Sequence, residues 1–312
     1  MSSPASSPIL ITGATGLVGR ALMAELTRRH PDRPLRFLTR DPSRHPSTPH
    51  HPAEAFGWNL ETQEIQKGAL EEVGTIIHLA GEPVAQRWTD AAMRKIRTSR
   101  IDSLDLIRAA CQDAGAAPRI ISASAIGFYP PGDDTKSESM VGGQGFLADT
   151  VSDWEKSAAQ LGGLGGGHAS LRIGLVLSTK GGALQRLLPI YRWGLGAPLA
   201  SGNQWQSWIH LDDLVTLMAE AVDNDAFSGP VNAVSPHPVT QRKFSQALAK
   251  VLRRPHFFPA VPSWALRLWF GEAAEALLAS HRILPEKLQS LDFQFQHPDL
   301  PSALQDLVDR KA

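Results

Sequence analysis

ILITGATGLVG, residues 9–19, is the stretch that decides the fold, because a short apolar run meets three glycines spaced three apart. The β-branched run from Ile9 to Thr12 predicts a buried strand. After it, Leu17, Leu22 and Leu26 share roughly one face of a helix. A strand, a glycine-rich turn and a helix in this order are typical of dinucleotide-binding proteins, because the turn must be tight and the backbone must approach a pyrophosphate.

This loop is therefore the candidate cofactor site, and a turn that serves only packing is the alternative. The helix N-terminus offers free N–H groups and partial positive charge to phosphates. The residues that we predict to contact the cofactor here are Gly13, Thr15, Gly16, Leu17, Val18 and Gly19.

The end of the second predicted strand, residues 34–39, indicates which dinucleotide binds. Proteins that bind NAD usually place a carboxylate there for the ribose 2′-hydroxyl. This chain has Thr39 and Arg40 instead, and a guanidinium can hold a 2′-phosphate with two hydrogen bonds. We therefore predict NADP as the cofactor. A solvated Arg40 that pairs with Asp41 is the alternative.

Strand and helix patterns alternate along the rest of the first half. Further strands are predicted over residues 75–80, 119–122, 171–178 and 231–234, with helices over 91–114 and 149–161. This order predicts an α/β fold with a doubly wound parallel sheet of the Rossmann type and a smaller, mostly helical second lobe. The predicted division is interleaved: residues 8–178 and 231–235 form the dinucleotide-binding domain, and residues 179–230 and 236–312 form the second lobe.

Composition excludes several classes of protein. The 312 residues carry no formal net charge and are 42% apolar, so no overall field favours nucleic acid or a membrane. The single cysteine, Cys111, cannot form an internal disulfide, and no cysteine and histidine pattern has zinc spacing. The N-terminal MSSPASSP lacks the regions of a signal peptide. We expect a short disordered tail, a cytoplasmic protein and no metal.

Several further motifs complete a resemblance. They are HLAGEP (78–83), KIRTSR (95–100), SASAIGFY (122–129), LRIGLVLS (171–178), SWIHLDDLV (207–215) and LPEKLQSLDFQFQHP (284–298). With ILITGATGLVG, they resemble the atypical extended short-chain dehydrogenase/reductases, and within them the epimerase family proteins. The resemblance runs from Ile9 to about Val308 and implies a small C-terminal domain.

The resemblance also implies roles for particular residues. Leu79, Ala80 and Gly81 should run beneath the cofactor, and Val176 should close over its nicotinamide end, with packing as the alternative for Val176. Lys95 and Arg100 are similar to basic helix residues that face the cofactor, and a solvated helix face is the alternative.

One feature of the family is missing. Typical members carry a tyrosine that transfers the substrate proton and, four residues later, a lysine that lowers its pKa. Counted back from Glu155, these positions hold Leu147 and Val151, and neither side chain can transfer a proton. Ordinary dehydrogenase or epimerase chemistry is therefore in doubt, whereas cofactor binding is not.

Three other residues could carry a proton. Ser124 matches the family's serine, and a strand-end serine that caps backbone is its alternative. Tyr129 should lie at the rim of the sheet, where packing is the alternative. Glu82 follows a cofactor-contacting strand and could act as a base if desolvated, or could cap a helix or pair with Arg87.

The second lobe adds candidates for enclosing a ligand. Trp205 and Trp208 could stack on a flat or sugar-like compound, or belong to the core, and His210 should approach the pocket. Asp212 and Asp213 should complement the dipole of the helix that they begin.

Two functions follow. The first is an NADP-dependent oxidoreductase or epimerase for a small polar substrate, with nucleotide-linked compounds as one class. The second is a non-catalytic NADP(H)-binding or sensing module that acts through a protein partner. A homodimer would fit the resemblance.

Overall fold

The computed structural model describes residues 7–45 and 53–310, so the first six residues of the tail expected over residues 1–8 lie outside it. Its centre is an eight-stranded sheet in the order β12-β8-β6-β5-β1-β2-β3-β4, in which the pair β3–β4 is antiparallel and the others are parallel. The strands are β1 (Ile9–Thr12), β2 (Leu35–Thr39), β3 (Glu54–Asn59), β4 (Glu64–Ile65), β5 (Thr75–His78), β6 (Arg119–Ala125), β8 (His168–Ile173) and β12 (Gly229–Ala233).

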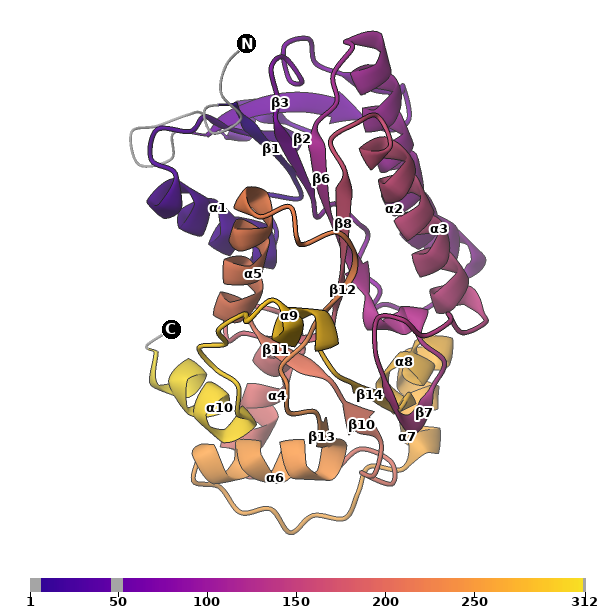
Figure 1. Cartoon of the computed structure of the whole chain (residues 1–312). Coiled ribbons are helices and arrows are strands. Elements are labelled where there is room, and N and C mark those ends of the chain that lie inside the picture. The colour runs from indigo at the N-terminus through magenta and orange to yellow at the C-terminus, as the bar shows by residue number, and fades with distance from the viewer. Residues whose placement is uncertain (1–6, 46–52, 311–312) are drawn as a thin grey trace.

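Helices cover both faces of this sheet (Figure 1). On one face lie α1 (Leu17–Arg29) and α5 (Leu211–Asp223), which pack on Ile9, Ile11 and Ile77. On the other lie α2 (Asp90–Asp113) and α3 (Phe146–Gly162), which pack on Leu10 and Ile76. Successive strand residues point to opposite faces, so one apolar run such as Ile9–Ile11 contributes to both cores. This arrangement confirms the predicted doubly wound α/β fold.

The second lobe lies beyond the carboxyl ends of the strands and is mostly helical (Figure 1). Its helices are α4 (Gly182–Arg192), α6 (Gln241–Val251), α7 (Ser263–Phe270), α8 (Ala274–Leu278), α9 (Glu286–Ser290) and α10 (Leu300–Asp309). Short strands pair within and around it: β9 (Leu175–Leu177) with β11 (Trp208–His210), β10 (Trp205–Gln206) with β13 (Val239–Thr240), and β7 (Gly132–Lys136) with β14 (His281–Ile283). The described residues also include short 3₁₀ turns: η2 (Pro42–Arg44), η3 (Ile126–Phe128) and η4 (Gly271–Ala273).

Two parts of the sheet differ from the sequence-based expectation. The strand expected over residues 171–178 is broken at Gly174, where the Ser207 backbone comes so close that a Cβ would lie 2.6 Å from its carbonyl oxygen. The chain therefore leaves the main sheet and continues as β9 beside β11. Strands β3 and β4 were not expected, because they lie at the sheet edge and Phe56 is the only fully buried residue of β3.

β7 also qualifies the predicted division of the chain. It lies within residues 8–178, yet it pairs with β14 near the C-terminus. The dinucleotide-binding domain and the second lobe are thus more interleaved than the predicted boundaries imply. The exact boundaries stay a prediction. Within residues 7–45 and 53–310, no helix has both the length and the apolar character to cross a bilayer.

The Thr12 hydroxyl holds the backbone that follows β5. Thr12 is fully buried, and its Oγ1 accepts hydrogen bonds from the backbone N–H groups of Leu79 (3.1 Å) and Ala80 (3.0 Å). Thr12→Val keeps the shape but removes this acceptor, so we expect a loss of about 1 to 3 kcal/mol in the free energy of unfolding. Urea denaturation measures it. Thr12→Ser keeps the hydroxyl, and an equal loss in that variant would contradict the explanation.

Candidate functional site

The glycine loop is compressed between its neighbours. Gly13 has a φ of +69°, and a Cβ on it would lie 2.7 Å from the carbonyl oxygen of Leu79. A Cβ on Gly19 would lie 2.3 Å from the carbonyl oxygen of Gly13. Only glycine fits either position, because real Cβ atoms do not approach backbone so closely. The loop therefore presents backbone where a ligand can approach.

The start of α1 leaves its hydrogen-bond donors free of side chains. Helix α1 begins after Gly16 with no side-chain cap, so its first-turn N–H groups are available to an anion. Arg20 donates from its guanidinium to the carbonyl oxygen of Thr15 and so holds the loop from outside. The loop and helix together have the shape and the donors that a dinucleotide pyrophosphate requires.

Arg40 lies beside this loop. The register pairs Thr12 with Leu38, so Thr39 and Arg40 continue just past the strand end next to Gly13. Arg40 is exposed, and Asp41 pairs instead with Arg44 at 2.9 Å. Among the described residues Arg40 forms no ion pair, so the pairing with Asp41 considered above is not formed.

Arg100 is a partly buried cation beside Gly81. Its guanidinium carbon lies where a Cβ on Gly81 would come within 2.9 Å, and Nη1 donates to the carbonyl oxygen of Ile96 at 2.8 Å. The guanidinium also lies 5.0 Å from the ring centre of Trp154 on α3. Burial lowers the pKa of Arg100 to about 10, against the opposing charge of Glu82, so it stays charged at neutral pH.

The neighbours of Arg100 do not compete with it for a ligand. His78 is fully buried, its Nε2 lies 2.8 Å from Ser103 Oγ, and burial with the charge of Arg100 lowers its pKa to about 3. It is therefore neutral at physiological pH. Lys95 lies on the same helix but is exposed. The α3 positions that lack the tyrosine and lysine are apolar: Val151 is buried, and Leu147 packs near Gly127.

Ser124 belongs to a buried chain of hydrogen bonds. Its hydroxyl donates to Glu155 Oε1 at 2.6 Å, and the Arg172 guanidinium forms two bonds of 2.8 Å to the two oxygens of Glu155. Arg172 Nη1 then donates to the Tyr129 hydroxyl at 2.9 Å, which donates to Asn232 Oδ1 at 2.7 Å. Glu155 is thus the acceptor that orients Ser124.

This chain of bonds corrects the expectation for Tyr129. Its side chain is 1% exposed, not at an open rim, and its hydroxyl already accepts from Arg172 and donates to Asn232. Burial raises its pKa, although Arg172 opposes the shift. Because the side chain is enclosed and its hydroxyl is bonded to Arg172 and Asn232, the structure does not bring Tyr129 into the site.

Glu82 keeps a more accessible position. Its backbone N–H donates to Ser99 Oγ at 2.9 Å, and its carboxylate accepts from Gln86 at 3.3 Å. The side chain is partly buried and close enough to Arg100 to act on its charge. Among the described residues no ion pair joins it to Arg87, so that pairing is not formed.

The second lobe reaches the loop through a small contact. A Cβ on Gly181, just before α4, would lie 3.1 Å from Leu17 Cδ2 at the start of α1. Val176 lies in β9, opposite Ile209 of β11, and is partly buried. The second lobe therefore meets the start of α1 with apolar groups, and the closure of Val176 over the nicotinamide stays a prediction.

Three other second-lobe candidates lie in structural positions. Trp208 is fully buried in the core of α4, α6 and α10, so it cannot stack on a ligand. Trp205 is partly buried, and the guanidinium of Arg282 lies 4.5 Å from its ring centre. His210 is also fully buried: its Nδ1 accepts the N–H of Asp212 and caps α5. The packing alternative therefore describes the two tryptophans, and the expectation that His210 approaches the pocket is wrong, because its ring is buried as a helix cap.

The carboxylates after His210 do begin a helix, as expected, and they also hold the C-terminal segment. Asp213 accepts the N–H groups of Gln296 (2.7 Å) and His297 (3.1 Å), and Asp212 pairs with Arg310 at 2.6 Å. α5 is thereby tied to the end of the chain. These acids act on the fold and not on a ligand.

His210, His297 and Asp306 come close enough together to suggest a metal site. The hydrogen bond from Asp212 N–H requires a lone pair on His210 Nδ1, so neutral His210 carries its proton on Nε2. That nitrogen lies 3.3 Å from Asp306 Oδ2 and cannot at the same time ligate a metal. Asp306 is also paired with Arg310 at 2.7 Å. The ion pairs of this cluster therefore join the start of α5 to α10.

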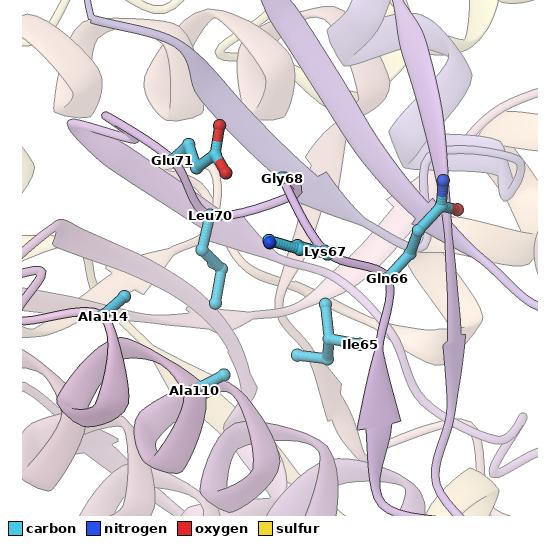
Figure 2. A pocket seen from close by; sticks show the side chains of 8 residues that line it. All are labelled: Ile65, Gln66, Lys67, Gly68, Leu70, Glu71, Ala110 and Ala114. Atoms are coloured by element: carbon cyan, nitrogen blue, oxygen red, sulfur yellow. The ribbon is translucent and has the colours of Figure 1, made fainter.

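A shallow pocket of about 200 Å³ is lined by residues outside the candidate cofactor site (Figure 2). It is formed by the segment after β4 and the last turn of α2, with Leu70 and Ala110 on its walls. The end of α2 precedes β6, so the pocket lies at the opposite edge of the sheet from the glycine loop. It is not part of the candidate site.

Comparisons with known proteins agree with this geometry. Residues 9–148 match the NAD dependent epimerase/dehydratase family, and residues 261–307 match a domain of unknown function. The chain is 38% identical over 303 residues to an epimerase family protein of Mycobacterium bovis, covering 96% of this chain and 97% of that one. It is 34% identical over 307 residues to the chloroplastic epimerase family protein SDR39U1 homolog of Arabidopsis thaliana, covering 96% and 86%.

Two solved structures are also similar. The human epimerase family protein SDR39U1 with NADPH superposes with a TM-score of 0.85 at 26% identity, covering 97% of this chain and 100% of that one. The nucleoside-diphosphate sugar epimerase from Corynebacterium glutamicum superposes with a TM-score of 0.75 at 30% identity, covering 97% and 59%.

The Glu155–Arg172 pair yields a prediction. The side chains are 15% and 4% exposed, so Glu155→Gln leaves a buried guanidinium without its counter-charge. We expect a loss of about 3 to 5 kcal/mol in the free energy of unfolding, measured by urea denaturation. Lys156→Gln removes a charge from the exposed face of the same helix and should change little. If both substitutions have the same small effect, the pair does not hold the site.

Proposed function

The chain belongs to the NAD dependent epimerase/dehydratase family, within the epimerase family proteins, and on that premise we propose that it binds NADP(H) and acts on a small polar substrate. The finer proposal is an oxidoreductase or epimerase, with nucleotide-linked compounds as the first substrate class to test. A structure 30% identical to this chain is titled a nucleoside-diphosphate sugar epimerase, which supports that choice.

The observation that supports NADP is the freedom of Arg40. An acidic residue at the end of β2 would repel a 2′-phosphate, and here Asp41 is turned away by Arg44 and Ser43. The Arg40 guanidinium, exposed beside the glycine loop, can then form two charge-assisted bonds to the phosphate. The NADPH-bound human relative supports the same assignment.

Arg100 takes over part of the role of the missing lysine. It is a cation next to Gly81 and between α2 and α3, whereas Val151 offers none. In the proposal Gly13, Gly16 and Gly19 hold the pyrophosphate, and Arg100 holds a ribose hydroxyl or phosphate oxygen. When bound, NADP(H) supplies a hydride acceptor or donor.

Ser124 and Glu82 are the residues left for proton transfer. The Ser124 hydroxyl donates to Glu155 and keeps a lone pair, so it can accept from a substrate hydroxyl and pass a proton toward the carboxylate. Glu82 could act as a base from the other side of Arg100. Tyr129 has no part in the proposal.

A non-catalytic NADP(H)-binding or sensing module is the second candidate. It is favoured by the apolar Leu147 and Val151 and by the engagement of Ser124 with Glu155. A screen for NADPH oxidation across polar carbonyl and nucleotide-linked compounds separates the two functions. Turnover that requires Ser124 supports the enzyme, whereas tight NADPH binding without turnover supports the module.

Arg40→Ala tests the cofactor. We expect the affinity for NADPH to fall by about tenfold or more, since one charge-assisted bond to a charged group is worth about 1.5 to 3 kcal/mol, while the affinity for NADH stays unchanged. Isothermal titration of both nucleotides measures this. Arg254→Ala is the control, because Arg254 is also exposed and basic but lies in the second lobe, outside the candidate site. Equal weakening of both nucleotides by Arg40→Ala would reject the assignment.

Ser124→Ala tests the proton path. On a substrate found by the screen, kcat should fall by roughly 10²-fold, the share that a positioned proton-transfer group supplies. NADPH affinity should persist, and urea denaturation should show a loss of about 1 kcal/mol from the missing hydrogen bond. Ser157→Ala, on a buried serine of α3 away from Glu82, is the matched control. Full activity of Ser124→Ala would leave the serine with a structural role alone.

A further inference from the structure

Although the chain has no formal net charge, its acidic and basic residues are unevenly distributed along the sequence. Residues 180–211 and 226–271 contain nine lysines and arginines and no aspartate or glutamate, although the chain as a whole has 31 residues of each sign. These two runs supply α4, α6, α7 and the loops between them. α6 and the loop that follows it lie at the end of the second lobe remote from β3 (Figure 1).

Large apolar side chains are exposed in the same two runs. Trp193 is 83% exposed, Phe257 is 73% exposed and Leu195 is 57% exposed. A single exposed apolar residue is ordinary, whereas a group of them rimmed by polar residues marks an interaction site. We call this group the aromatic-basic surface: Arg192, Trp193, Leu195, Arg253, Arg254, Phe257 and Phe258.

The two segments of this surface are adjacent in space. Gly194, between Trp193 and Leu195, has a φ of +76°, and a Cβ on it would lie 3.5 Å from Pro255 Cγ. The rings of Phe257 and Phe258 stack with their centres 4.8 Å apart. The turn after α4 therefore touches the loop after α6, and the aromatic side chains of both belong to one region.

The cations of this surface are not neutralised by the protein. Arg192, Arg253 and Arg254 are exposed, and among the described residues none of them forms an ion pair. The outer side of α6 adds Arg242, Lys243 and Lys250, which are also exposed. Such a surface is complementary to a partner with a high density of negative charge.

The apolar side chains select among anionic partners. Tryptophan and phenylalanine partition into the boundary between lipid headgroups and acyl chains, and neighbouring arginines attract anionic headgroups. Aromatic residues could also stack on the bases of a nucleic acid. Leu195 and the half-exposed Ile190 offer no flat face for stacking, but they gain from burial among acyl chains.

We propose that the aromatic-basic surface docks the second lobe onto an anionic lipid membrane. The contact is peripheral, with the aromatic side chains at headgroup depth and the arginines against phosphates. None of its residues belongs to the cofactor site, so the proposal is independent of the function proposed above.

Flotation of the full-length protein with lipid vesicles tests this. The vesicles are phosphatidylglycerol with phosphatidylcholine, or phosphatidylcholine alone, at low and high salt. We expect binding to the anionic vesicles only, weakened by salt. Arg192→Glu with Arg254→Glu should weaken binding by at least about 25-fold, since each basic group near such a surface is worth about fivefold. Phe257→Ser should weaken it at both salt concentrations.

Matched controls lie on the other part of the molecule. Lys67→Glu with Arg94→Glu makes the same change of charge at exposed positions, and Val141→Ser removes an apolar side chain that is 85% exposed. Both should bind vesicles as the unaltered chain does, and thermal unfolding and NADPH titration confirm that each variant is folded. Equal binding to neutral vesicles, equal loss in the controls or no binding at all would overturn the proposal. So would preferential binding of single-stranded nucleic acid by the same residues.

Discussion

The bidentate ion pair between Glu155 and Arg172 is the interaction on which the rest of the structure depends. Glu155 comes from α3 and Arg172 from β8, so the pair fixes a helix to the sheet beneath it. Through Tyr129 and Asn232 the same bonds reach β12 and the carbonyl oxygen of Leu284 in the C-terminal segment. Charges this deeply buried are tolerable only when all their hydrogen bonds are made, so the position of Ser124 is set by the same requirement.

The sequence predicted the sheet because its strands are short, apolar and buried on both faces. Ile9–Thr12 and Thr75–His78 are recognisable without a partner, and the glycines of the first loop identify the turn between β1 and α1. β3 was not recognisable, because only one of its six residues, Phe56, is buried. The break at Gly174 depends on a close approach of Ser207, thirty-three positions away, and a local pattern carries no sign of it.

The candidate site was predicted unevenly for a similar reason. Backbone requirements are visible in a sequence, so the glycine loop and the strand end at Arg40 could be located. Hydrogen-bond partners are not visible: nothing local shows that Asp41 turns to Arg44, that Arg100 lies over Trp154 or that Tyr129 is closed off by Asn232. The formal charge of zero was likewise misleading, because it is a sum over the whole chain and does not show that residues 180–211 and 226–271 contain basic residues without acidic ones.

The uneven distribution of charge along the chain gives the molecule an electric dipole. The acid-free runs carry nine positive charges, and the rest of the chain carries 22 positive and 31 negative charges, a net charge of −9. A dipole of this kind is felt before any contact is made, so the protein would approach a charged object already oriented, and two copies at low ionic strength would attract each other head to tail. An isoelectric point near 7.2 therefore does not describe how this protein behaves in solution, because the field around it has a direction even where its total charge vanishes.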